Sequence, residues 1–232
     1  SNELCSERYK VSREDQDRYA AASYARALAA ISGGRFKDQI VPVSIPQRKG
    51  DDLLFETDEC IRETSYDMLS AMKPAFKKDG LGTAGNASII SDGAAAVVVM
   101  SRNKAEELGC SIMASIGAQA SFGIDMKYVL VAPIWAIPKC LSKEGIQKDD
   151  VDLFEINDAF SGSTVAVMKE LGLDHGKVNV NGGSVALGHP IGASGCRVLI
   201  TLLYEMIQQD IKTGLATLCL GGGEAVALII KR

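Results

Sequence analysis

Hydrophobic and polar positions divide the chain into two regions. In residues 1–90 one helical pattern stands out: Ser12 precedes an acidic first turn and an alanine-rich stretch that ends at Gly33. A serine followed by acidic residues favours a helix start. Residues 39–50 contain two prolines and several β-branched residues, which predict an extended, exposed connection. We therefore expect residues 1–90 to pack on a core rather than to form one.

From residue 91 onward, predicted strands and helices alternate. Apolar and β-branched runs predict strands at 94–100, 111–120, 151–156, 177–180, 215–220 and 225–230. Amphipathic or apolar stretches predict helices at 101–109, 132–145, 159–171 and 194–209. Alternation at this spacing is typical of a layered α/β domain, which we expect to extend from about residue 111 to 232.

Composition narrows the class of protein. The 232 residues are 47% hydrophobic, and 25 basic against 29 acidic residues give a net charge of −4. Without a basic stripe, the chain lacks the surface that binds nucleic acid, and its apolar runs are too short to span a membrane. The six cysteines form no CxxC pair and no metal-ligand spacing. This pattern indicates reduced thiols in an intracellular protein, cytoplasmic or mitochondrial. Because the sequence begins with Ser1 rather than Met, we expect a processed chain or part of a longer one.

Candidate chemistry is concentrated in three loops that each follow a predicted strand. They are EINDAF (155–160), NGGSVALGHPIGASG (181–195) and CLGGGEA (219–225). Loops that follow strands are where α/β folds place their binding and catalytic residues.

His189 is the first candidate. It lies between Gly188 and Pro190 in the most glycine-rich loop, where the main chain can approach a ligand closely. A neutral imidazole there can act as a base or as a hydrogen-bond donor. The alternative is a histidine that bonds a carbonyl in a tight turn. For His175, in LDHGK, we expect only an exposed loop residue.

Cys219 is the second candidate. It ends a predicted strand before Gly221, the first of three glycines whose N–H groups are free to stabilise a thiolate. We therefore expect its pKa to be lowered and its thiol to be the most reactive of the six. The alternative, a small buried apolar residue, is our interpretation of the other five cysteines. No GK[ST] follows the glycines, which excludes a nucleotide triphosphatase loop.

Asn157 and the turn TAGNAS (83–88) complete the candidates. Asn157 follows the strand 151–156 and precedes a helix, so it also fits a helix N-cap. Asn86 and Ser88 lie in a turn of small residues, where such residues are common for structural reasons alone.

As a set, these motifs resemble the thiolase family, and within it the biosynthetic acetyl-CoA acetyltransferases. SREDQD (12–17), TAGNAS with SDGAAAVVVM (91–100), FEINDAF, VNVNGGSVALGHPIGASG and CLGGG occur in the family's order and cover essentially the whole chain. The resemblance implies a layered αβαβα fold. It implies a Claisen condensation of two acetyl-CoA molecules to acetoacetyl-CoA and CoA, or the reverse thiolysis, with CoA thioesters as substrates and no separate cofactor or metal.

The resemblance also implies roles for single residues. The counterpart of His189 activates a nucleophilic cysteine and donates to the thioester oxygen, and that of Cys219 moves the α-proton of the second acetyl group. Asn157 corresponds to a residue that holds an oxyanion-hole water, and the Gly221 N–H to a donor of the other oxyanion hole. Ser88, Phe160 and Ala87 correspond to residues that bind the substrate's pantetheine arm. Asp158 replaces a commoner glutamate, which we expect to loosen a contact beside Asn157.

The family's acylated cysteine has no counterpart in this sequence. By resemblance, residues 1–90 correspond to the end of the loop domain, 91–110 to the last segment of the N-terminal domain and 111–232 to the C-terminal domain. We therefore expect a separate N-terminal polypeptide to carry the nucleophile, an uncovered apolar face on this chain, and a homo-oligomer, dimer or tetramer. The alternative is a non-catalytic, thiolase-like structural or interaction subunit.

Overall fold

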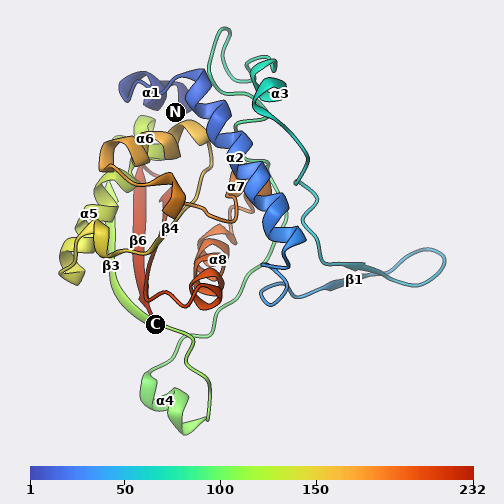
Figure 1. Cartoon of the computed structure of the whole chain (residues 1–232), viewed down its shortest axis with the longest axis vertical. Helices are drawn as coiled ribbons and strands as arrows, with labels where there is room; N and C mark the ends of the chain where they lie inside the picture. Colours follow the sequence, from blue (N-terminus) through green and yellow to red (C-terminus); the bar gives the residue numbers. More distant parts are fainter.

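The computed structural model describes all 232 residues, and a four-stranded mixed sheet lies at its centre (Figure 1). The strand order is β3-β6-β5-β4, with bounds β3 (Ser115–Gly123), β4 (Leu153–Ile156), β5 (Thr213–Leu220) and β6 (Glu224–Lys231). β4 and β5 are parallel, and the other two pairs are antiparallel. Ile156 lies opposite Thr217, so β4 and β5 both deliver their following residues to one edge of the sheet.

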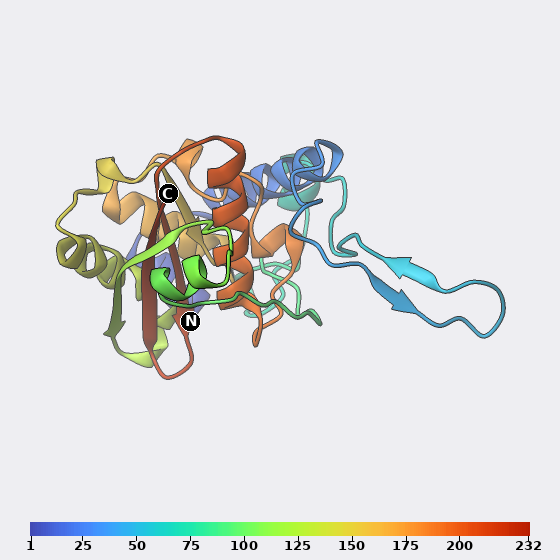
Figure 2. The ribbon, with the colours of Figure 1, turned by 90° about the horizontal axis from the view of Figure 1, so that it is seen from below.

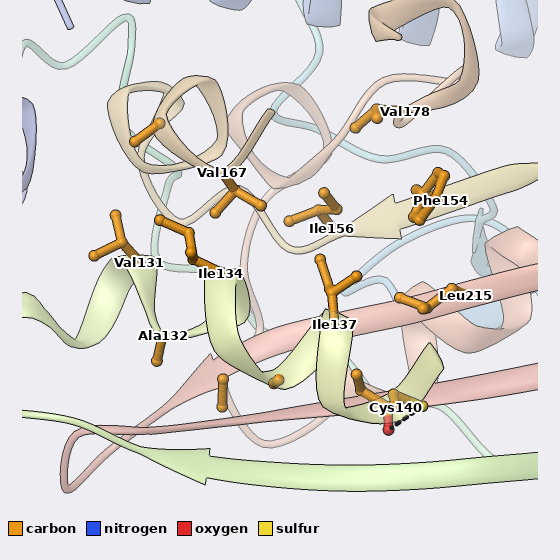
Figure 3. Close-up of a cluster of buried hydrophobic side chains, with 14 of the residues drawn as sticks. Val131, Ala132, Ile134, Ile137, Cys140, Phe154, Ile156, Val167, Val178 and Leu215 are labelled. Atoms are coloured by element: carbon orange, nitrogen blue, oxygen red, sulfur yellow. Dashed lines mark hydrogen bonds between the residues drawn. The ribbon is translucent and has the colours of Figure 1, made fainter. Parts of the chain in front are cut away.

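Alternation along the strands gives the sheet two apolar faces. Phe154 and Ile156 of β4 belong to the main core beneath α5 (Pro133–Glu144), which Figure 3 shows in close-up. Leu153 points to the opposite face and packs with α8 (Ser194–Gln208). Because successive side chains of a strand point to opposite faces, Glu155 shares the α8 side with Leu153. The helices thus cover both faces, and the predicted α/β layering is confirmed.

The N-terminal helices extend this core. α1 (Asn2–Arg8) and α2 (Arg13–Ser32) pack against α6 (Ser161–Leu171), and α2 also contacts α3 (Tyr66–Ser70) and α7 (Ser184–Leu187). The predicted start of α2 is confirmed by a capping box: the Ser12 hydroxyl accepts the Asp15 N–H at 3.0 Å, and the Asp15 carboxylate accepts the Ser12 N–H at 2.9 Å. The first 90 residues thus pack on the sheet domain, as expected. The expectation that they form no core of their own is wrong, because α2 and α3 build a second buried apolar cluster with α7.

Two predicted strands are absent. Residues 91–100 form no strand, although Val97, Val98 and Val99 have high β-propensity, because no neighbouring strand pairs with them. Val98 is 85% exposed. Residues 177–180 also form no strand: the short 3₁₀ turn η3 (His175–Lys177) is followed by a single bridge from Val178 to Phe154.

A two-stranded hairpin projects from the body of the protein (Figures 1 and 2). It consists of β1 (Val43–Ile45) and β2 (Leu53–Phe55), antiparallel with Val43 opposite Phe55. The sequence predicted an exposed, extended connection here, and the structure adds the pairing. Val41 at its base is 84% exposed.

The remaining elements are short. The predicted helix at 101–109 is observed as α4 (Arg102–Glu107), and two further 3₁₀ turns are η1 (Met126–Val131) and η2 (Lys148–Asp150). No helix of the chain combines the length and the apolar character needed to cross a membrane.

Candidate active site

The turn TAGNAS and the two residues after it are joined to two of the candidate loops, 155–160 and 181–195, through main-chain hydrogen bonds. The Ser88 N–H donates to the Ala159 carbonyl at 3.0 Å, and Ala87 forms a β-bridge with Phe160. One residue further, the His189 N–H donates to the Ile89 carbonyl at 2.9 Å. The structure therefore brings together three loops that are far apart in the sequence, and it holds them by groups that every residue carries.

His189 is held as a neutral ring with Nε2 unprotonated. Its Nδ1 lies 2.6 Å from the Ser194 Oγ, and that hydroxyl already donates to the Pro190 carbonyl at 2.9 Å. The Ser194 hydroxyl must therefore accept a hydrogen bond from the Nδ1–H group, which leaves Nε2 unprotonated and able to act as an acceptor. Burial lowers the pKa of His189, and the charge of Arg197 lowers it further. A half-buried, neutral imidazole with a bare nitrogen can accept a proton from a nucleophile.

Gly188 explains the main-chain conformation before this histidine. Its φ of +94° lies in the region that favours glycine, and an added Cβ would collide with the Ser91 hydroxyl. The loop thus requires glycine at this position for two separate reasons.

Asn157 extends the sheet and directs its amide at His189. Its N–H donates to the Thr217 carbonyl at 3.0 Å, and its Nδ2 lies 3.5 Å from the His189 Nε2. The N-cap interpretation is wrong, because α6 begins at Ser161 and Phe160 occupies the N-cap position. The buried side chain of Asn157 therefore caps no helix, and its amide faces His189 instead.

Cys219 and Gly221 lie at the same edge of the sheet, two and four residues beyond Thr217. The Gly221 N–H makes no main-chain hydrogen bond, so the predicted free donor is present. The expectation of a lowered thiol pKa is wrong. Burial raises the pKa of Cys219 to about 11, because the apolar surroundings disfavour the thiolate. Its thiol is therefore protonated at neutral pH in this structure.

The predicted substrate contacts gather around the bridge between Ala87 and Phe160. Ala87 is buried, whereas Ser88 and Phe160 are partly exposed. The Phe160 ring meets Phe76 edge to face, with 5.3 Å between ring centres. An aromatic wall beside a partly exposed serine can contact a ligand that has both apolar and amide groups.

Two acids behind the site are deeply buried. Burial raises the pKa of Glu155 to about 8 and that of Asp158 to about 6, while the charge of Arg197 opposes both shifts. The Asp158 carboxylate accepts the Ser184 N–H and, at 3.1 Å, the Tyr19 hydroxyl. The expectation that a shortened acid loosens this region is therefore wrong, since Asp158 is fully enclosed and bonded.

The sequence analysis did not identify Ser184, Ser194 or Arg197. Ser184 and Ser194 lie in the same glycine-rich motif as His189, which was the one available signal. Arg197 lies within α8, and only the fold shows that it lies close to Glu155 on the face of the sheet that α8 covers.

The other expectations about histidine and cysteine are partly wrong. His175 is half-buried and stacks on Tyr19 with 5.2 Å between ring centres, rather than being an exposed loop residue. Cys5 and Cys140 are buried as expected, but Cys110 is exposed. No group of three or more His, Cys, Asp or Glu side chains is arranged to hold a metal ion.

Comparison with known proteins connects this geometry to a family. Residues 110–232 match the family model "Thiolase, C-terminal domain", and residues 1–103 match "Thiolase, N-terminal domain". An acetyl-CoA acetyltransferase of Pseudomonas aeruginosa is 54% identical over 231 residues, which are 99% of this chain and 59% of that protein.

Solved structures agree. The crystal structure of the Bacillus anthracis acetyl-CoA acetyltransferase superimposes with a TM-score of 0.96 at 45% identity, and that of human mitochondrial 3-ketoacyl-CoA thiolase with 0.95 at 37%. Each covers 99% of this chain, whereas the chain covers 58% of each of them. The chain thus spans less than two thirds of the length of these relatives.

Proposed function

The chain belongs to the thiolase family, and from this premise we propose that it provides the acid–base half of an acetyl-CoA C-acetyltransferase site. The reaction is the condensation of two acetyl-CoA molecules to acetoacetyl-CoA and CoA, or the reverse thiolysis. The observation that carries the proposal is the pairing of a neutral His189 with the Asn157 amide, 3.5 Å apart, beside the turn that carries Ser88.

Each residue has a role that its surroundings support. The bare Nε2 of His189 takes the proton of a nucleophilic cysteine, and the protonated ring then donates to the thioester oxygen. The Asn157 amide provides a second polar group on that side, directly or through a water. The free N–H of Gly221 meets the other oxyanion. Donors placed in this way are each worth about 10² to 10³ in rate.

Cys219 handles the α-proton. When the nucleophilic cysteine is acylated, the departing CoA sulfur takes the Cys219 proton. The Cys219 thiolate formed in this way then removes a proton from the methyl group of the second acetyl-CoA, the resulting carbanion attacks the acyl carbon, and the acyl–cysteine bond breaks. The leaving sulfur takes the proton held by His189. In thiolysis the Cys219 thiol gives its proton to the departing carbanion. The raised pKa of Cys219 supports the donor role at rest.

The nucleophile comes from a polypeptide segment with the character of a thiolase N-terminal half. The exposed apolar run from Val97 to Met100 supports this, because β-branched residues that have no neighbouring strand in this chain can pair with a strand of another segment. The assembled enzyme binds acetyl-CoA and CoA through Ser88, Ala87 and Phe160, and it forms a homo-oligomer. The six free cysteines favour a reducing compartment such as the cytoplasm.

Reconstitution tests the proposal. The chain is mixed with an N-terminal thiolase segment that carries the acylated cysteine, and CoA-dependent cleavage of acetoacetyl-CoA is followed. We expect turnover in the mixture, its loss in His189→Ala, and its retention in the matched control His175→Ala. A complex that forms with wild-type chain but shows no turnover favours the non-catalytic subunit instead.

A further inference from the structure

A hydrogen-bonded pair lies at the oxygen end of the Asn157 amide, opposite the end that faces His189. The Arg197 Nη2 donates to the Ser184 Oγ at 2.7 Å, and the Ser184 hydroxyl donates to the Asn157 Oδ1 at 2.6 Å. Nothing in the proposed reaction uses either residue. We call these two side chains the Arg197–Ser184 pair.

The chemistry of the pair fixes the direction of each hydrogen bond. A guanidinium group can only donate, so Ser184 must accept from Arg197 and has its own proton free for Asn157. Asn157 must then present its oxygen to Ser184. Its Nδ2 is consequently the end that faces His189. A side-chain amide can otherwise rotate by half a turn about its last bond and exchange the two ends.

His189 alone sets this orientation only weakly. The distance from its Nε2 to the Asn157 Nδ2 is 3.5 Å, the outer limit of a hydrogen bond, whereas the Ser184 contact is short. The stronger constraint on the amide therefore comes from Ser184, which is fully buried.

Three elements hold the pair in place. The Nη1 of Arg197, on α8, lies 3.6 Å from the Oε1 of Glu155, a buried residue of β4. The main-chain N–H of Ser184, at the start of α7, donates to the Asp158 carboxylate. The main chain of Asn157 is fixed by its N–H on the Thr217 carbonyl, and its side-chain amide is held by Ser184.

The charge of Arg197 is only loosely neutralised. Its Nε and Nη1 have no hydrogen-bond partner, although both atoms are buried. A guanidinium without a close carboxylate remains a strong donor through Nη2, because hydrogen bonds from ionised groups are stronger than neutral ones. This polarises the Ser184 hydroxyl and, through it, the Asn157 amide.

We propose that Arg197 and Ser184 are positioning residues that orient the Asn157 amide so that its N–H bonds point into the site beside His189. The effect of this orientation on catalysis rests on the proposed function, whereas the orientation of the amide can be tested in the chain by itself. Neither residue touches substrate.

The first test measures His189 in the purified chain. Only two histidines are present, so their ring C–H signals can be titrated by NMR and assigned with His175→Ala. Ser184→Ala removes the hydroxyl and lets the amide turn, so the neutral His189 ring loses a donor on Nε2. We expect the pKa of His189 to rise by about 0.5 unit while that of His175 stays unchanged.

The other ionisable groups around Arg197 and His189 remain in this variant. They are Glu155, Asp158, Asp58 and Cys60, and Arg197 keeps its charge. A rise in the pKa of His189 would therefore report the changed orientation of the Asn157 amide, not a change in the charges around the ring. Ser184→Thr retains the hydroxyl and is expected to retain the wild-type pKa. Ser6→Ala removes another buried hydroxyl, one that accepts from Gln16 at 3.1 Å, and serves as the matched control.

The second test uses the reconstituted enzyme. Ser184→Ala is expected to lower kcat about tenfold with an unchanged KM for acetoacetyl-CoA, because a misdirected donor affects the transition state rather than substrate binding. Ser184→Thr and Ser6→Ala are expected to retain turnover.

The two tests separate the proposals. If wild-type mixtures never turn over, the proposed function fails, and the NMR titration still decides on the Arg197–Ser184 pair. If Ser184→Ala only lowers the melting temperature and leaves both the His189 pKa and kcat unchanged, the pair is structural and the inference is overturned.

Discussion

The thiol of Cys219 is expected to react slowly with alkylating reagents, in contrast to what its place at a strand end before three glycines first indicated. Burial raises its pKa from the ordinary 9.0 to about 11. Two pKa units reduce the thiolate fraction at pH 8 about a hundredfold, and the thiolate is the reactive form.

The assay is alkylation of the folded chain with iodoacetamide, followed by peptide mapping. Cys110 provides the reference because its side chain is exposed. At pH 8 we expect Cys219 to be labelled about a hundredfold more slowly than Cys110. Its rate should rise about tenfold with each pH unit up to roughly pH 10, because each unit multiplies the thiolate fraction by ten.

A denatured control completes the experiment. In concentrated urea the surroundings of both residues become the same, so their labelling rates should converge. Labelling of folded Cys219 as fast as Cys110, or a rate that does not depend on pH, would refute the argument that apolar burial controls this thiol.

Three further predictions follow from the site and its surroundings. In the reconstituted enzyme, His189→Ala should lower kcat at least about 100-fold with little change in KM, whereas Ser88→Ala should mainly raise KM. Steady-state kinetics measure both constants, and the assignment would be contradicted if the two variants showed the opposite patterns. Burial raises the folded-state pKa of Glu155 to about 8 and that of Asp158 to about 6, so between pH 5 and 8 the folded chain binds more protons than the unfolded chain. The melting temperature should therefore fall as the pH is raised from 5 to 8, and Glu155→Gln should make that fall smaller. The chain alone should self-associate through the exposed apolar run Val97–Met100. Val98→Lys should shift the mass measured by light scattering toward the 24.6 kDa monomer and weaken binding of the N-terminal segment. A wild-type chain that stays monomeric would count against an apolar docking surface there.

Patterns along the chain predicted most of the sheet domain. β5, β6 and α8 appear close to their predicted bounds, because their apolar positions match the period of the element and each has a partner within the chain. The run 94–100 has the same β-branched character and still forms no strand. A strand requires a neighbour, and local composition does not say whether one is present.

The candidate site was predictable to the extent that chemistry lies in motifs. His189 and Asn157 were found because each lies in a loop that the pattern placed after a strand, and the fold brings them together even though the strand predicted at 177–180 does not form. Arg197 was missed, because its bond to Ser184 joins α8 to the start of α7, 13 residues away, and depends on how the two helices pack. Cys219 was found, but its pKa was predicted in the wrong direction, since burial is a property of the folded surroundings and not of the motif.

Main-chain hydrogen bonds tie the loops of the site to the turn 83–90: Ser88 to Ala159, and His189 to Ile89. Bonds of this kind do not depend on which side chains are present. Substitutions at Ile89 or Ala159 can therefore change the shape and polarity of the side chains beside the site while these main-chain hydrogen bonds are retained. Such an arrangement lets the side chains around His189 and Asn157 vary while these two residues stay where they are, and the same positions are natural targets for reshaping the surroundings of the site.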